Sequence, residues 1–299
     1  MSSKTKLNSC LKRREIKTKM DLLQNELIEL QTLSGNDLEN YYMRVKELDD
    51  DALTVFWKPK QAAQNANDGK LMVEAAVEGY KDVLELLTKA YNGVQSANDT
   101  FVDDEWEVLQ NELNEIIAGI KTIARFTEYN GQYLINGNYK SSNKESKATF
   151  LVGISTSDIV TYEPINMNPD VLGETKLSSP LTADDGSTEV TNVFLDFFSR
   201  DGHIDKSTGQ KISLSINSTE LATIALSSIE DAIFQVKEVL VQANLTILEL
   251  ERIKGFMRSK ADKGEKFLMQ FKNTHAEDLA TDLENLTNQL ELVTSMSDI

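Results

Sequence analysis

The chain has 299 residues, of which 31 are Lys or Arg and 48 are Asp or Glu, so its formal net charge is −17 at pH 7. A polyanion of this size is poorly suited to phosphate contacts, so we expect neither nucleic acid nor membrane as a partner. One cysteine, Cys10, excludes an intrachain disulfide, and His203 and His275 are too few for a histidine-rich metal site. The sequence has neither a signal-peptide pattern nor a long apolar run, so we expect no cleaved signal.

The N-terminal segment carries the spacing of an amphipathic helix that ends near Gly35. Its apolar residues recur three or four positions apart: Ile16, Met20, Leu23, Leu27 and Leu30. An acidic stretch that includes Asp49 follows, and the pattern is interrupted up to Pro59, where proline favours a helix start or break. We predict a buried turn at residues 55–57 in this interruption.

Two further helices follow. Apolar periodicity returns at Gln61 and continues to Asn92-Gly93, a pair typical of a helix end and turn. The next helix is predicted to start near Asp103, because an acidic residue suits the positive end of a helix, and its apolar stripe runs from Trp106 to Ile123.

The periodicity changes between Tyr129 and Thr219. Short apolar runs such as 150–152 and 159–162 flank glycine and serine, and three of the four prolines lie in this third of the chain. We therefore predict small β-hairpins here. His203, next to Asp201 and Gly202, is interpreted as a loop residue and not as a ligand.

The C-terminal third carries the longest heptad pattern. Between Leu226 and Met257 the spacings alternate between three and four, which predicts a coiled-coil helix. The predicted rod core comprises Leu226, Ile229, Ile233, Val236, Leu240, Ile247 and Leu250, with Ala243 in the same stripe. After a possible break at Gly264, the same alternation resumes at Leu279, Leu283, Leu286 and Leu290.

These patterns predict a mainly α fold, in which both chain ends form a long antiparallel bundle or coiled coil around a small insert that contains β-hairpins. Residues 1–42 and 263–299 are expected to be the two helical arms of a terminal domain. Residues 43–175 would form a helical rod with a hairpin, 176–220 a variable insert, and 221–262 the C-terminal helix of the rod. Isolated arms have too little to pack against, so we expect copies of the chain to cover them.

Six short segments, taken together and in order, resemble the bacterial flagellins and the related flagellar hook–filament junction proteins. The segments are Gln61–Gly69, Glu78-Gly79 with Tyr91–Gly93, Phe126–Gly131 with Leu134, Phe150–Gly153, Ile229–Val236, and Glu277–Leu283 with Leu286-Thr287. The resemblance covers roughly residues 61–170 and 221–299. The acidic segment 36–56 departs from it, because the family has a basic block rich in serine and alanine there.

The resemblance implies a subunit that is exported through the flagellar secretion channel and polymerises into an extracellular filament. The two sets of terminal residues, Ile16 to Leu30 and Leu279 to Leu290, would then line the filament core. The implied partners are other copies of the chain, flagellar hook and cap proteins, and an export chaperone.

Other functions remain open at this point. Gly131–Leu134 followed by Asn136-Gly137 also suits the hook–filament junction proteins, and a coiled-coil adaptor unrelated to flagella would share the leucine stripes. An enzyme is disfavoured, because no glycine-rich phosphate loop, nucleophile elbow or metal motif is present, and we expect no cofactor.

The resemblance also yields a prediction about immune recognition. The family's contact with its innate immune receptor centres on an arginine, and the matching position here is Asp82, near Glu85 and Leu86. Because the charge is reversed, we expect purified monomer to give weak or no signal in a reporter-cell assay. Strong activation would contradict this expectation.

Overall fold

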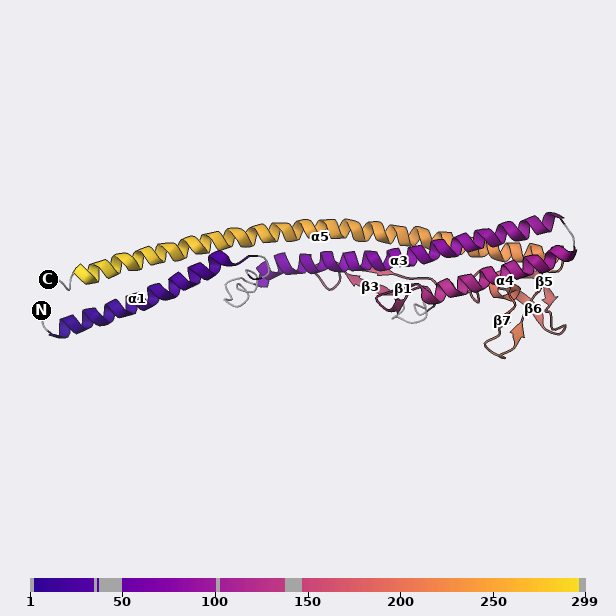
Figure 1. Cartoon of the computed structure of the whole chain (residues 1–299), viewed down its shortest axis with the longest axis horizontal. Coiled ribbons are helices and arrows are strands. Elements are labelled where there is room, and N and C mark those ends of the chain that lie inside the picture. The colour runs from indigo at the N-terminus through magenta and orange to yellow at the C-terminus, as the bar shows by residue number, and fades with distance from the viewer. Residues whose placement is uncertain (1–2, 35–36, 38–49, 101–102, 138–146, 296–299) are drawn as a thin grey trace. The chain divides into compact units, whose positions relative to one another are not determined.

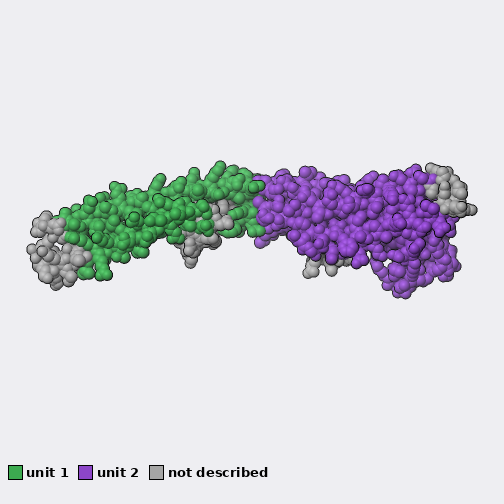
Figure 2. Space-filling model, in the orientation of Figure 1, with its two compact units in different colours: residues 1–61, 256–299 green, residues 62–255 purple. Residues whose placement is uncertain are grey.

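A computed structural model describes residues 3–34, 37, 50–100, 103–137 and 147–295. Within these residues the main elements are the helices α1 (Ser3–Thr32), α3 (Asp50–Thr100), α4 (Asp103–Phe126) and α5 (Thr219–Ser295) (Figure 1). The chain divides into two compact units, one made of residues 1–61 and 256–299 and the other of residues 62–255 (Figure 2). The predicted mainly α class, with terminal helices that pack together and small sheets in the middle of the chain, is confirmed.

The unit of residues 62–255 is built on a core shared by three helices. Tyr80 and Leu87 of α3, Ile120 of α4, and Val236 and Ala243 of α5 are all buried in one cluster. In each helix the buried residues lie three or four positions apart, so one face of the helix is apolar and turns inward. The helix α4 folds back along α3 (Figure 1). This bundle forms the scaffold on which the β-hairpins of the middle segment are held.

A tight hairpin follows α4. Its strands are β1 (Glu128–Tyr129) and β2 (Gln132–Tyr133), which pair antiparallel. The turn residues Asn130 and Gly131 both have positive φ angles, 50° and 77°. A two-residue turn with two positive φ angles matches the twist of the flanking strands. Asparagine and glycine occupy it because they tolerate positive φ better than other residues do.

The second hairpin confirms the sequence prediction for residues 150–162. The strands β3 (Ala148–Leu151) and β4 (Ile159–Tyr162) pair antiparallel along their whole length. Two side chains attach them to α3: Asn65 Nδ2 donates to the Leu151 carbonyl at 2.7 Å, and the Tyr162 hydroxyl donates to the Tyr80 hydroxyl at 3.1 Å. Burial raises the pKa of both tyrosines, so both hydroxyls stay protonated in this contact.

The remaining short elements form a lobe beside α4 and α5. The strand β5 (Thr175–Thr182) pairs with β6 (Glu189–Val193), the 3₁₀ helix η1 (Leu195–Phe198) follows, and β7 (His203–Ile204) pairs with β8 (Lys211–Ile212). Pro180 lies where the register of β5 shifts, since proline cannot donate to a ladder. The buried Ser228 hydroxyl of α5 donates to the Gly173 carbonyl at 2.7 Å and so attaches the lobe to the bundle.

Three predicted interruptions are wrong, because helices run through all of them. The helix α3 includes residues 55–57 and Pro59, and Trp57 is exposed rather than buried in a turn. It also passes Asn92-Gly93, because Gly93 does not adopt the left-handed conformation of a helix C-cap. The helix α5 passes Gly264, where burial of Ala261 and Leu268 offsets the weak helix propensity of glycine.

Residues 38–49 of the acidic segment lie outside the described residues.

A buried glycine in α3 yields a prediction about stability. A Cβ added at Gly79 would lie 2.6 Å from Thr127 Oγ1 and 2.9 Å from Ile135 Cδ1, whereas at Gly255 it would meet nothing within 4 Å. We expect Gly79→Ala to lower the free energy of unfolding by about 1–3 kcal/mol through overpacking. The matched control Gly255→Ala should raise it by about 0.5–1 kcal/mol, because alanine is the better helix former.

Chemical unfolding of the two variants beside the wild type measures both changes. Equal stabilisation by the two substitutions would show that the close approach at Gly79 is not real.

Candidate functional site

The helix α1 and residues 256–295 of α5 form an antiparallel pair within their unit. Leu30 of α1 packs with Leu268 and Leu279 of α5. Nearer the beginning of α1, Leu23 lies beside Leu286 and Leu292 of α5 along one shallow groove. Residue numbers therefore rise along one helix as they fall along the other, which places the start of α1 beside the end of α5 (Figure 1).

The predicted terminal residues lie on the facing sides of this pair. The buried ones are Ile16, Leu30, Leu279 and Leu286, and the half-buried ones are Met20, Leu23, Leu27, Leu283 and Leu290. The two sets come together because spacings of three and four keep one face of each helix apolar. Contacts between these residues and other copies of the chain stay a prediction.

A second apolar face, which the sequence reasoning missed, flanks the contact between the same helices. Leu22 of α1 and Leu292 of α5 are 64% and 63% exposed, and Leu11, Phe256 and Phe267 are also exposed. At about 100° of rotation per residue, these five residues lie roughly a third of a turn from the inward-facing leucines. An eleven-residue spacing, from Leu11 to Leu22 and from Phe256 to Phe267, was the signal available in the sequence.

The predicted rod core lies on the inner side of α5 in the other unit. Ile229, Val236 and Leu250 are buried, and Leu226, Ile233, Leu240 and Ile247 are half-buried and pack against the core. The opposite face of this stretch is also apolar, since Phe234, Val241, Leu245 and Leu248 are more than half exposed. Their spacings of seven, four and three repeat the pattern of the inner face.

The region compared with the receptor contact lies on α3. Asp82 and Glu85 are exposed, whereas Leu86 is half-buried and approaches Gly119 of α4. The structure therefore leaves both carboxylates on the surface of the helix. The sequence-based expectation of weak receptor signalling depends on these two charges.

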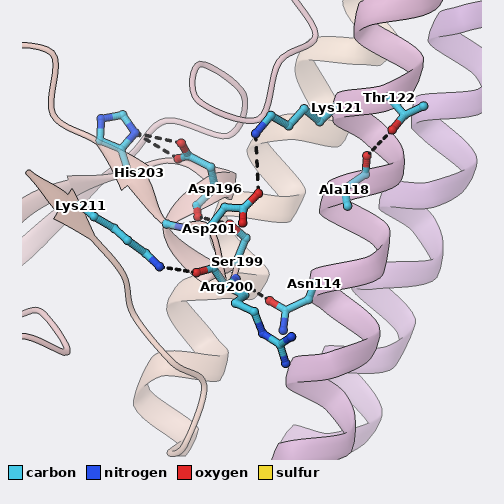
Figure 3. A network of polar contacts seen from close by, with 11 residues as sticks. Asn114, Ala118, Lys121, Thr122, Asp196, Ser199, Arg200, Asp201, His203 and Lys211 are labelled. Carbon is cyan, nitrogen blue, oxygen red and sulfur yellow. Dashed lines mark hydrogen bonds and ion pairs between the residues drawn. The ribbon is translucent and has the colours of Figure 1, made fainter. Parts of the chain in front are cut away.

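A polar cleft of ≈ 980 Å³ lies between α4 and the lobe. Figure 3 shows how polar contacts hold the two walls together. Asn114 Oδ1 of α4 accepts the Arg200 backbone N–H at 2.6 Å, and Lys121 Nζ lies 3.7 Å from Asp201 Oδ2. Lys211 Nζ donates to the Arg200 carbonyl, so two side chains, Asn114 and Lys211, hold the backbone of this residue.

The pair of Asp196 and His203 stabilises the fold of the lobe at one edge of this cleft (Figure 3). His203 Nδ1 lies 3.1 Å from each carboxylate oxygen of Asp196. The imidazole ring stacks on the rings of Phe197, at 4.6 Å between centroids, and of Phe194, at 5.5 Å. The interpretation of His203 as a loop residue is wrong, because it begins β7 and packs against η1. No sequence pattern indicated its partner, which lies seven residues away across a turn.

Within the described residues the structure contains no group of three or more metal-ligating side chains. In the same part of the chain, no helix has an apolar stretch long enough to cross a bilayer.

The Asp196 carboxyl yields a prediction about pH. Burial raises the pKa of Asp196 from 3.8 to about 6, although the adjacent His203 opposes part of this rise. Between pH 3.8 and about 6, the Asp196 carboxyl therefore keeps a proton in the folded state that it releases in the unfolded chain. The resulting stability is fully present below pH 3.8 and is lost as the pH rises through about 6.

Two pKa units correspond to roughly 3 kcal/mol. We expect the wild type to lose stability relative to Asp196→Asn by up to this amount between about pH 4 and pH 7, because the amide does not titrate. Urea unfolding of both proteins across this range measures the difference. A difference that is independent of pH would contradict the prediction and would mean that Asp196 is ionised throughout.

Comparison with known proteins gives a family model and several curated relatives. Residues 57–140 match the model of the bacterial flagellin N-terminal helical region. Flagellin A of Helicobacter pylori is 27% identical over 140 residues, which cover 44% of this chain and 27% of the relative. Flagellin E of Vibrio cholerae is 30% identical over 112 residues, or 37% of this chain and 28% of the relative. The matches thus span little more than a quarter of the length of these curated relatives.

A solved structure of FliC from Burkholderia pseudomallei aligns with 60% of this chain and 98% of its own, at 16% identity and a TM-score of 0.42. Agreement at this level does not define a family. The family model and the curated flagellins agree with each other, however, and with the collinear motifs of the sequence. On these grounds the chain is similar to the bacterial flagellins, and the family model places that similarity at residues 57–140.

Proposed function

We propose that this chain is a structural subunit that polymerises into the extracellular filament of a bacterial flagellum, with α1 and the end of α5 in the filament core. The role is mechanical and not enzymatic. One observation carries the proposal: both helices of the terminal pair have a second set of apolar side chains, and Leu22 and Leu292 stay 64% and 63% exposed.

This second face favours association, because each large aliphatic side chain removed from water contributes roughly 1.5–3 kcal/mol. A pair of helices can cover only the two faces that meet. The outer faces of α1 and α5 then require other molecules, and further copies of the same pair present matching apolar surface. Contacts that do not close on themselves generate open helical assemblies, which is the geometry of a filament.

The outer stripe of α5 in the unit of residues 62–255 supports the same role. Phe234, Val241, Leu245 and Leu248 would give neighbouring bundles an apolar contact in addition to that of the terminal pairs. Under this proposal the chain is exported unfolded through the flagellar secretion channel. Hook and cap proteins and an export chaperone are then its partners besides other copies of itself.

A hook–filament junction role is the second candidate within the superfamily. The hairpin of β1 and β2, followed by Asn136-Gly137, is the feature that favours it. Electron microscopy of the purified chain under polymerising conditions separates the two candidates. Long filaments from the chain alone support the filament role, whereas short rings that require added hook proteins support the junction role. A coiled-coil adaptor unrelated to flagella would form neither.

Charge on the outer face yields a specific prediction. We expect Leu22→Glu and Leu292→Glu to abolish filaments or to raise the concentration needed for assembly at least tenfold, because burial of an unpaired carboxylate costs more than about 1.4 kcal/mol. Stability of the monomer should change by less than about 0.5 kcal/mol, since both side chains are exposed. Sedimentation and electron microscopy measure assembly, and thermal unfolding measures stability.

The matched control is Gln24→Glu, which adds the same charge at an exposed position of α1 on a different face. It should assemble as the wild type does. Normal filament formation by Leu22→Glu and Leu292→Glu would contradict the proposed role of the outer face.

A further inference from the structure

We infer that the cleft between α4 and the lobe is a binding site for a neutral, polyhydroxylated ligand, that is, a short saccharide. The cleft volume of ≈ 980 Å³ is at the upper end of the range in which proteins bind small molecules. One wall is a continuous face of α4 from Asn111 to Lys121, which is about 15 Å long at 1.5 Å per residue. The facing walls come from residues 166–171 and 196–206.

The charges in the cleft are balanced and mostly paired within the chain. Lys121 faces Asp201 at 3.7 Å, Lys206 donates to Asp170 at 3.0 Å, and Asp196 contacts His203 at 3.1 Å. The lining also carries Arg200 and Glu115. With three cations against four carboxylates, it has no excess of positive charge to hold a phosphate or another anion. The pairs also leave too few free carboxylates for a divalent cation, and no metal-ligating group of three is found among the described residues. A neutral ligand therefore fits the cleft better than an ion does.

The amide side chains are oriented so that donors remain for a ligand. Asn114 Oδ1 already accepts the Arg200 and Gln110 N–H groups, at 2.6 and 3.2 Å. Its amide nitrogen Nδ2 makes no hydrogen bond within the described part of the chain. The Lys121 ammonium can donate further, and the Asp201 carboxylate can accept further, because the 3.7 Å contact between them uses little of either. Sugar hydroxyls both donate and accept, so they suit such an interleaved set.

Apolar surface lies between these polar groups. Ala118 and Ile117 lie on the α4 wall, and Ile204 of β7, which is 51% exposed, lies on the wall of the lobe. An apolar lining with a few fixed polar groups is the usual composition of a small-molecule site. The C–H faces of a pyranose ring need this kind of contact while its hydroxyls reach the amides and carboxylates. The polar network that fixes Arg200 and Asp201 holds this wall in place before a ligand arrives (Figure 3).

The experiment uses the full chain and three neutral trisaccharides: maltotriose, cellotriose and triacetylchitotriose. Saturation-transfer NMR at millimolar sugar concentration detects weak binding, and titration calorimetry measures Kd. We expect transfer to at least one sugar. Ala118→Trp, which fills the α4 side of the cleft, and Ile204→Trp, which fills the opposite wall, should each weaken binding at least about tenfold, which corresponds to 1.4 kcal/mol.

The matched control is Val108→Trp, because Val108 is an exposed residue of α4 that does not line the cleft. This variant should bind as the wild type does, and thermal unfolding of all four proteins checks that each is folded. Retention on resins that carry the corresponding polysaccharide would identify a surface glycan as the ligand, whereas binding of the free sugars alone would identify a soluble saccharide. Failure of the wild type to bind any of the three sugars, or equal binding by Ala118→Trp and Ile204→Trp, would overturn the inference.

Discussion

The terminal helices carry apolar side chains on two faces, roughly a third of a turn apart, and a pair of helices can cover only one face of each. The two units differ in how much of their apolar surface they bury within the chain. In the terminal pair, Leu30 meets Leu268 and Leu279, while Leu22 and Leu292 are mostly exposed to solvent. A helix that is apolar on both sides is at its most stable only when it is buried on both sides, so the pair favours association with further helices.

The unit of residues 62–255 differs, because the helices and hairpins among its described residues bury their inner faces within one chain. Tyr80, Ile120 and Val236 come from three different helices and share a single core. Polar contacts complete the attachment of the hairpins, as in the bond from Asn65 Nδ2 to the Leu151 carbonyl. The unit is therefore packed as a folded domain is, although the outer stripe of α5 and single residues such as Val108 and Phe126 stay exposed. A complete bundle joined to an incomplete helix pair suits a subunit that is folded before assembly and acquires its last contacts from its neighbours.

Heptad spacing predicted the inner faces because the period of a helix is a local property of the sequence. Leu23, Leu27 and Leu30 needed no knowledge of their partners to be recognised as one face. The outer faces were missed because only one apolar stripe was considered in each helix. Phe234, Val241 and Leu245 form a second stripe with the same kind of spacing. Helix ends at Gly93 and Gly264 were wrongly predicted because propensity is a weak local term that tertiary burial overrides. The stacking of His203 against Asp196, Phe194 and Phe197 depends on a turn geometry that no periodicity encodes.

The measurement that tests this account most directly is a helical reconstruction of the assembled protein by electron cryo-microscopy. The account predicts an inner shell formed by α1 and residues 256–295, in which Leu22 and Leu292 contact neighbouring copies and lose their exposure to water. Filaments in which these two residues still face solvent, or in which the terminal pair lies on the outer surface, would contradict it.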